Sequence, residues 1–96
     1  MMKAKKKFYV VAYDLKSDRN RNKVSKILEK YGVRANFSVF ECMFTVKQLE
    51  NVKERIARLI DKRTDRVIYY PLCFNCHTGI YRQPPHETLI TIVEMV

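Results

Sequence analysis

The sequence predicts a single α+β domain over residues 1–96, and three observations lead to that class. Apolar, β-branched runs that are typical of strands alternate with two stretches whose apolar residues recur at helical spacing. The chain has 96 residues, of which 47% are hydrophobic, and this is enough for one core but not for two. The order β-α-β-(β)-α-β, followed by a loop and an extra C-terminal strand, is that of a ferredoxin-like sandwich.

The first strand and the first helix occupy the N-terminal third of the chain. Residues 8–15, FYVVAYDL, predict a strand, and apolar side chains on both of its faces indicate a central position in the sheet. The helix that follows is indicated by a stripe at i, i+3, i+4 and i+7 that consists of Val24, Ile27, Leu28 and Tyr31. Ser17 or Asp18 is expected to cap its start, and Gly32 is expected to occupy the C′ position after its end.

Residues 33–45, VRANFSVFECMFT, are strand-like, but their alternation changes phase. Apolar side chains stand at odd positions up to residue 39 and at even positions from residue 40. A pattern of period two cannot change parity without a bulge or a tight turn. We therefore expect either two short strands or one strand that is sharply kinked near residues 38–40.

The second helix begins at a recognisable capping signal. Thr45 and Gln48 form the T-x-x-Q capping box, and Phe44 is placed to pack on Leu49 as a hydrophobic staple. The apolar stripe of this helix continues to about Asp61 and consists of Leu49, Val52, Ile56, Leu59 and Ile60.

The C-terminal third is predicted to contain two further strands. Residues 65–72, DRVIYYPL, form the next strand, which Pro71 is expected to stop because proline cannot donate to a ladder. Residues 72–87 look irregular, and residues 88–96 form the last strand.

Right-handed crossovers place both helices on one face of the sheet, so the apolar residues on its other face need a cover. A second copy in a two-fold homodimer is the expected one.

The charge balance points to a polyanionic partner. Nineteen lysine and arginine residues against ten acidic ones give a formal net charge of +9. Such an excess suggests nucleic acid, although lysines on solvated helix faces are the alternative.

No apolar stretch approaches the length of a membrane span, and MMKAKKK lacks the apolar segment of a secretory signal. We expect a cytoplasmic protein with no membrane partner and with reduced cysteines.

Asp14 is the first candidate for chemistry, because it is the single acid at the end of a strongly apolar strand. It could cap the helix or a turn, or it could bind a metal ion. Mg²⁺ is typically held by one or two carboxylates together with water and substrate phosphate. A two-fold dimer would supply the second carboxylate by placing two copies of Asp14 near its axis.

Cations surround the start of the first helix, namely Lys16, Arg19, Arg21 and Lys23. Positive charges at a helix N-terminus oppose the macrodipole, so the helix itself does not favour them there. Phosphate binding would explain them, because the free backbone N–H groups at this end also attract anions. A solvated basic face is the alternative.

The sequence CFNCH, residues 73–77, matches the C-x-x-C-H signature of haem attachment, but this chemistry belongs to exported proteins. A zinc site would need two more ligands, and Cys42 and His86 are scattered along the chain. We therefore expect Cys73 and Cys76 to be small buried thiols in a loop, with a zinc site as the minority alternative. The sequence contains no Walker loop, no G-x-G-x-x-G and no aromatic RNA-recognition signature.

Four segments resemble one family: YVVAYDL, RNRNKVSKILEKYG, RANFSVFEC and DRVIYYPLC. This family is the small CRISPR-associated adaptation subunit, the second of the core Cas proteins, which is described as a metal-dependent endonuclease. The resemblance implies a ferredoxin-like homodimer in which the final strand, residues 88–96, crosses to the partner's sheet. It also implies that the two subunits share Mg²⁺, or another divalent ion, through Asp14.

The resemblance further implies which residues take part in cleavage and binding. Family positions tied to cleavage correspond to Tyr13, Asp14, Arg21, Arg34, Ser38 and Phe40, and Lys23 stands where the family often has another arginine. Of these, the arginines would join Lys16, Arg19 and Lys23 in binding nucleic acid. Members are similar to nucleases that act on single-stranded RNA or duplex DNA, and they join the larger CRISPR integrase in spacer acquisition. A non-catalytic scaffold that binds duplex DNA and bridges the integrase is the alternative function.

Overall fold

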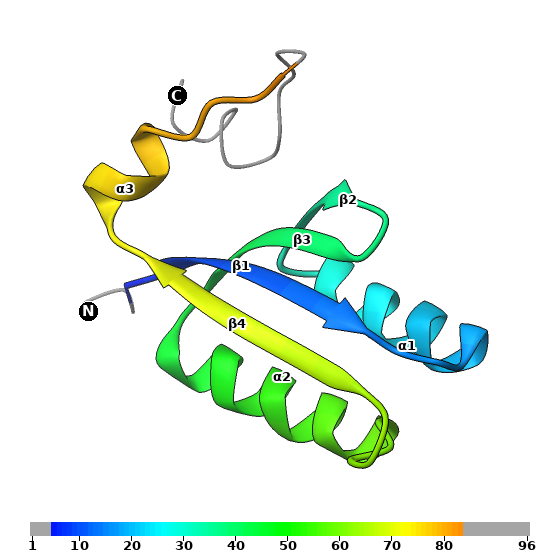
Figure 1. Cartoon of the computed structure of the whole chain (residues 1–96). Helices are drawn as coiled ribbons and strands as arrows, with labels where there is room; N and C mark the ends of the chain where they lie inside the picture. Colours follow the sequence, from blue (N-terminus) through cyan, green and yellow to red (C-terminus); the bar gives the residue numbers. More distant parts are fainter. Residues whose placement is uncertain (1–4, 84–96) are drawn as a thin grey trace.

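The computed structural model describes residues 5–83, and it shows a four-stranded antiparallel sheet in the order β2-β3-β1-β4 (Figure 1). The elements are β1 Lys7–Asp14, α1 Asp18–Glu29, β2 Gly32–Asn36, β3 Val39–Phe44, α2 Val46–Leu59, β4 Arg66–Leu72 and α3 Phe74–Thr78. This order confirms the α+β, ferredoxin-like prediction. The strand predicted for residues 88–96 lies outside the described residues.

Strand β1 lies in the interior of the sheet and is paired on both edges. It is antiparallel to β3 on one side and to β4 on the other, so that Val11 stands between Phe40 and Tyr69. The prediction of a central strand is therefore confirmed. Both edges of β1 are paired with a neighbouring strand, as are both edges of β3.

Helices α1 and α2 lie side by side on the same face of the sheet and enclose the core. The predicted stripes are buried there, and Val24, Leu28, Val52 and Ile56 are all at most 1% exposed. The Asn20 Nδ2 of α1 donates to the Leu59 carbonyl of α2 at 2.9 Å. Within residues 5–83 no helix is both long enough and apolar enough to cross a membrane.

Both helix starts carry side-chain caps. The Ser17 Oγ accepts a hydrogen bond from the Asn20 N–H, so Ser17 caps α1 and Asp18 lies in its first turn. At α2 the Thr45 Oγ1 accepts from the Gln48 N–H at 3.1 Å, and the Gln48 Oε1 accepts from the Thr45 N–H at 2.9 Å. The predicted capping box is confirmed.

The parity change at residues 38–40 marks a turn between two strands. Strands β2 and β3 are antiparallel, Phe37 and Ser38 join them, and the register shifts between Arg34 and Asn36. The prediction that Gly32 takes the C′ position of α1 is wrong, because Lys30 is the C-cap and Gly32, two residues later, is the first residue of β2. A Cβ on Gly32 would lie 1.9 Å from the Glu41 carbonyl oxygen, so the two strands approach each other closely there.

The end of β4 also differs from the prediction. Pairing continues through Pro71 to Leu72, which lies opposite Phe8, so Pro71 does not stop the strand. Proline is tolerated at this position because β4 is an edge strand of the described sheet. The segment predicted to be irregular contains the short helix α3, which contacts β1 (Figure 1).

The sheet face opposite the helices, called the open face here, is partly uncovered. The alternation of side chains places Val10, Ala12, Ile68 and Tyr70 on it. Ile68 and Tyr70 are 47% and 49% exposed. Glu41 of β3 lies on the same face, where it is buried and forms an ion pair with Arg82 from the segment after α3.

Gly32→Ala tests the close approach of β2 to β3. The added methyl group meets backbone atoms that cannot move away, so we expect the free energy of unfolding to fall by about 1–3 kcal/mol. Gly79→Ala is the matched control, because the nearest atom to its Cβ is 3.5 Å away. Equal denaturant midpoints for the two variants would contradict this account of the β2–β3 pairing.

Candidate functional site

A cavity of about 390 Å³ lies between the start of α1 and the turn that joins β2 to β3. Its lining residues are Tyr13, Asp18, Arg21, Asn22, Arg34 and Phe37. The sequence singled out Tyr13, Arg21 and Arg34, and the structure brings these three residues together. Asp18, Asn22 and Phe37 complete the lining, and sequence reasoning gave none of them a role at the site. Phe37 is 72% exposed in the turn, and no pattern in the sequence indicates this exposure.

Arg34 is held in place by three contacts. Its Nη2 donates to the Ser25 Oγ at 2.6 Å, and its Nη1 donates to the Phe37 carbonyl at 3.4 Å. The guanidinium carbon also lies 5.4 Å from the centre of the Phe40 ring, a cation–π distance. Arg34 is therefore a positioned cation at the cavity, with N–H groups left to bind an anion.

Tyr13 places a phenol in the same cavity. Its ring stacks on that of Phe40 at 6.3 Å between centroids, and its backbone N–H donates to the Ser38 carbonyl at 3.0 Å. Burial raises the pKa of Tyr13, and the nearby Arg34 opposes this only in part. The phenol is therefore protonated at neutral pH, so it can donate a hydrogen bond to a phosphate oxygen but is not a base.

Ser38 and Phe40 act on the cavity indirectly. Phe40 is fully buried beneath Tyr13 and Arg34, and Ser38 contributes its carbonyl oxygen to Tyr13. Both residues hold the cavity in shape. Neither of them is among the residues that line it.

Arg21 holds the loop between β1 and α1. Its Nη1 donates to the carbonyls of Leu15 and Lys16, and its Nη2 forms an ion pair with Asp18. The side chain of Arg21 remains 27% exposed. It therefore both fixes the loop and contributes positive charge to the cavity, which Asp18 partly offsets.

Asp14 is the last residue of β1 and is exposed. Successive side chains of a strand point to opposite faces, so Asp14 lies on the open face with Ala12, whereas Tyr13 faces the helices. Its partner in the register is Arg66. Among residues 5–83 the structure gives the Asp14 carboxylate no hydrogen bond or ion pair. The alternative in which Asp14 caps the helix is wrong, because Ser17 does so.

Asp65, which sequence reasoning missed, fixes the loop that follows Asp14. Its carboxylate accepts hydrogen bonds from the Asp61 N–H at 2.8 Å, the Lys16 N–H at 3.2 Å and the Thr64 hydroxyl at 3.3 Å. The backbone donors, first that of Asp61 and then that of Lys16, lower the pKa of Asp65. No periodic signal marks such a residue, because its donors lie in two loops that are distant in sequence.

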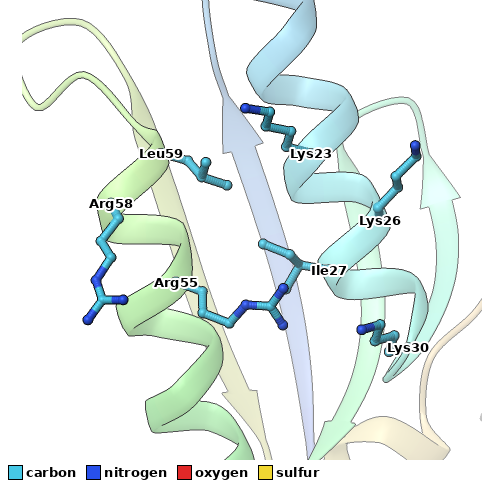
Figure 2. A pocket seen from close by; sticks show the side chains of 7 residues that line it. All are labelled: Lys23, Lys26, Ile27, Lys30, Arg55, Arg58 and Leu59. Atoms are coloured by element: carbon cyan, nitrogen blue, oxygen red, sulfur yellow. The ribbon is translucent and has the colours of Figure 1, made fainter.

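The cations that were predicted to cluster at the helix start lie in different places in the structure. Arg21 lines the cavity, Lys16 and Arg19 are exposed, and Lys23 lines a different groove of about 430 Å³ between α1 and α2. Figure 2 shows that groove, whose lining residues are Lys23, Lys26, Ile27, Lys30, Arg55, Arg58 and Leu59. Arg58 is paired there with Glu54.

The three cysteines fall into two classes. Cys42 is buried in the core, where burial raises the pKa of its thiol to about 12. The prediction that Cys73 and Cys76 are buried is wrong, because both are exposed beside α3. Among the side chains that the structure describes, no three of His, Cys, Asp or Glu are grouped as a metal site would require.

Comparison with known proteins gives a consistent result. The family described as "CRISPR associated protein Cas2" matches residues 7–79. The CRISPR-associated endoribonuclease Cas2 1 of Chloroflexus aurantiacus is 39% identical over 85 residues, covering 84% of this chain and 91% of the relative. A second relative, the CRISPR-associated endoribonuclease Cas2 4 of Rhodospirillum rubrum, is 34% identical over 88% of this chain and 73% of its own.

Two solved structures are similar as well. The crystal structure of Streptococcus pyogenes Cas2 has a TM-score of 0.72 and 29% identity, covering 78% of this chain and 96% of that one. A chain of a partial Cas6-RT-Cas1–Cas2 complex has a TM-score of 0.65 and 28% identity, covering 79% and 83%.

Asp65→Asn tests the hydrogen bonds that fix the loop beside Asp14. Because the folded-state pKa of Asp65 is lowered, its ionised form stabilises the fold above the ordinary aspartate pKa, and this contribution is lost as the pH falls through the folded pKa. We expect the variant to have a lower denaturant midpoint at pH 7. The difference from the unchanged protein should shrink on acidification below about pH 4. A difference that stays constant with pH would contradict this role.

Proposed function

The chain belongs to the Cas2 family of CRISPR-associated proteins, and we propose that it is a metal-dependent endonuclease that acts on nucleic acid during spacer acquisition. The observation that carries the proposal is the exposed Asp14 carboxylate, for which the described part of the chain provides no hydrogen bond or ion pair. Relatives named endoribonuclease or endonuclease support it. The substrate is single-stranded RNA or duplex DNA.

The residues fit a divalent ion shared between two copies of the chain. A carboxylate is the hard oxygen ligand that Mg²⁺ prefers, and Asp14 is not occupied by a structural role. Among the side chains that the structure describes, no three suitable ligands are grouped in one chain, and a second copy of the chain would supply a second carboxylate. A bound divalent ion would polarise a phosphate or activate a water molecule.

A second copy of the chain is the proposed source of that carboxylate. Asp14 lies on the open face, as do Ile68 and Tyr70, which leave about half of their surfaces exposed. A two-fold axis through this face would bury both side chains and bring the two strand ends toward each other. The open face and Asp14 therefore favour the same homodimer.

The cavity on the other side of β1 is proposed to bind the nucleic-acid backbone. Arg34 and Arg21 supply positive charge, and the neutral phenol of Tyr13 supplies a hydrogen-bond donor to phosphate. Lys16, Arg19 and Lys23 add an attraction that acts at longer range and weakens with salt. Sequence-independent binding is what such a set of donors provides.

A non-catalytic scaffold is the second candidate function. The similarity to a chain of the Cas6-RT-Cas1–Cas2 complex favours it, because that chain is part of an assembly with Cas1. In this role the homodimer would bind duplex DNA and bridge the CRISPR integrase. It would need the cationic cavity and the dimer but not the carboxylate of Asp14.

Asp14→Asn separates the two functions. The substitution keeps the shape of the side chain and removes its charge, so we expect cleavage stimulated by Mg²⁺ to fall by orders of magnitude with labelled RNA and duplex DNA. Glu54→Gln is the matched control, because it removes an exposed carboxylate from α2 and should leave cleavage unchanged. Cleavage at the original rate in Asp14→Asn would contradict the nuclease proposal. Duplex binding without any cleavage by the unchanged protein would favour the scaffold.

Tyr70→Glu tests the homodimer. A charge buried against the second copy would be costly, so light scattering at micromolar protein should show a dimer for the unchanged chain and a monomer for the variant. Val46→Glu is the control, because Val46 is 66% exposed at the start of α2 and not on the open face. Persistence of the dimer in Tyr70→Glu would show that this face is not the interface.

A further inference from the structure

The C-x-x-C sequence follows β4 directly and has no role in the proposed function. The Sγ atoms of Cys73 and Cys76 are 2.8 Å apart, and both residues are exposed. Because β4 is antiparallel to β1, this pair lies at the end of the sheet opposite Asp14, where Figure 1 shows α3 beyond the end of β4. The thiols are thus spatially separate from the candidate site.

The two sulfurs are chemically different. The Cys73 Sγ accepts a hydrogen bond from the Cys76 backbone N–H at 3.3 Å, and the Cys73 thiol donates one to the Cys76 Sγ. Once Cys73 is ionised, the thiol and the backbone N–H of Cys76 stabilise the charge on its sulfur, so they lower the pKa of Cys73. The pKa of Cys76 is raised, because its proton is shared with Cys73. An exposed thiol with a lowered pKa beside a second thiol is the arrangement of an attacking and a resolving cysteine.

We propose that Cys73 and Cys76 form a redox-active dithiol that reacts by exchange with disulfides of low molecular weight. The Cys73 thiolate attacks one sulfur of the small disulfide, breaks its S–S bond, expels one thiolate and leaves a mixed disulfide on Cys73. Cys76 then loses its proton to solvent, and its sulfur attacks Cys73 and expels the second thiolate. The protein gives up two electrons and gains one disulfide, while the small disulfide becomes two thiols.

A metal site is less well supported by the same residues. A soft metal ion bound by two thiolates would normally take a third or fourth protein ligand, and among the side chains that the structure describes none is grouped with this pair as a third ligand. The two Sγ atoms are 2.8 Å apart and a disulfide bond is about 2.05 Å long, so the second exchange step needs only a small further approach.

The test uses the reduced full chain incubated with glutathione disulfide under native conditions, followed by alkylation and intact mass measurement. We expect two thiols to be lost as one internal disulfide, with reversal by dithiothreitol. Cys42 serves as an internal control, because it is fully buried and should be alkylated only after denaturation. Zinc added to the reduced chain should leave the alkylation rate unchanged, whereas protection by zinc would favour a metal site and overturn the proposal.

Two single variants assign the roles of the sulfurs. Cys76→Ser should accumulate a stable mixed disulfide on Cys73, because no second sulfur can resolve it. Cys73→Ser should exchange about tenfold more slowly, since its remaining thiol ionises less readily. Equal rates in the two variants, or an unchanged chain that collects glutathione without forming an internal bridge, would overturn the proposal. Neither result depends on nuclease activity, so the test is independent of the proposed function.

Discussion

The pairing of β1 on both of its edges is the constraint on which the rest of the structure depends. Strands β3 and β4 fix β1 from Phe8 to Ala12 on one side and to Asp14 on the other. This pairing determines the direction of every side chain on the strand, so neighbours along the chain point to opposite faces. Tyr13 therefore points into the cavity at the start of α1, whereas Asp14 points to the open face. The chemistry available to the protein follows from this division.

The two faces of the sheet also differ in the charges they carry. The cavity side gathers Arg21 and Arg34 around a neutral phenol, and the groove between the helices carries further cations. The open face presents one carboxylate beside exposed apolar side chains. A second copy of the chain would bring two such carboxylates together, and each chain would contribute one of them as a metal ligand. The position of Asp14 therefore makes the proposed metal site depend on the dimer, and the dimer depend on the apolar open face.

Much of the fold could be predicted because the signals were local and periodic. The stripes of both helices, the capping box at Thr45 and the parity change before Phe40 each reflect spacings along the chain. The site was predicted less completely, because its decisive contacts join distant segments. Asp65 holds Lys16 across 49 residues, and Gly32 is required by a carbonyl of the neighbouring strand. The exposure of Cys73 depends on where α3 packs, which no spacing in the sequence reveals.

The central claim is that Asp14 holds a divalent ion at the end of β1. The most direct measurement is Mn²⁺ titration of the isotopically labelled chain, followed by paramagnetic broadening of backbone amide resonances. Carboxylate oxygens bind Mn²⁺ as they bind Mg²⁺, so the account predicts that the amides of residues 13–15 broaden first. The same amides should be unaffected in Asp14→Asn. Initial broadening around other carboxylates, such as Asp61 or Glu54, with the amide of Asp14 unchanged would contradict the claim.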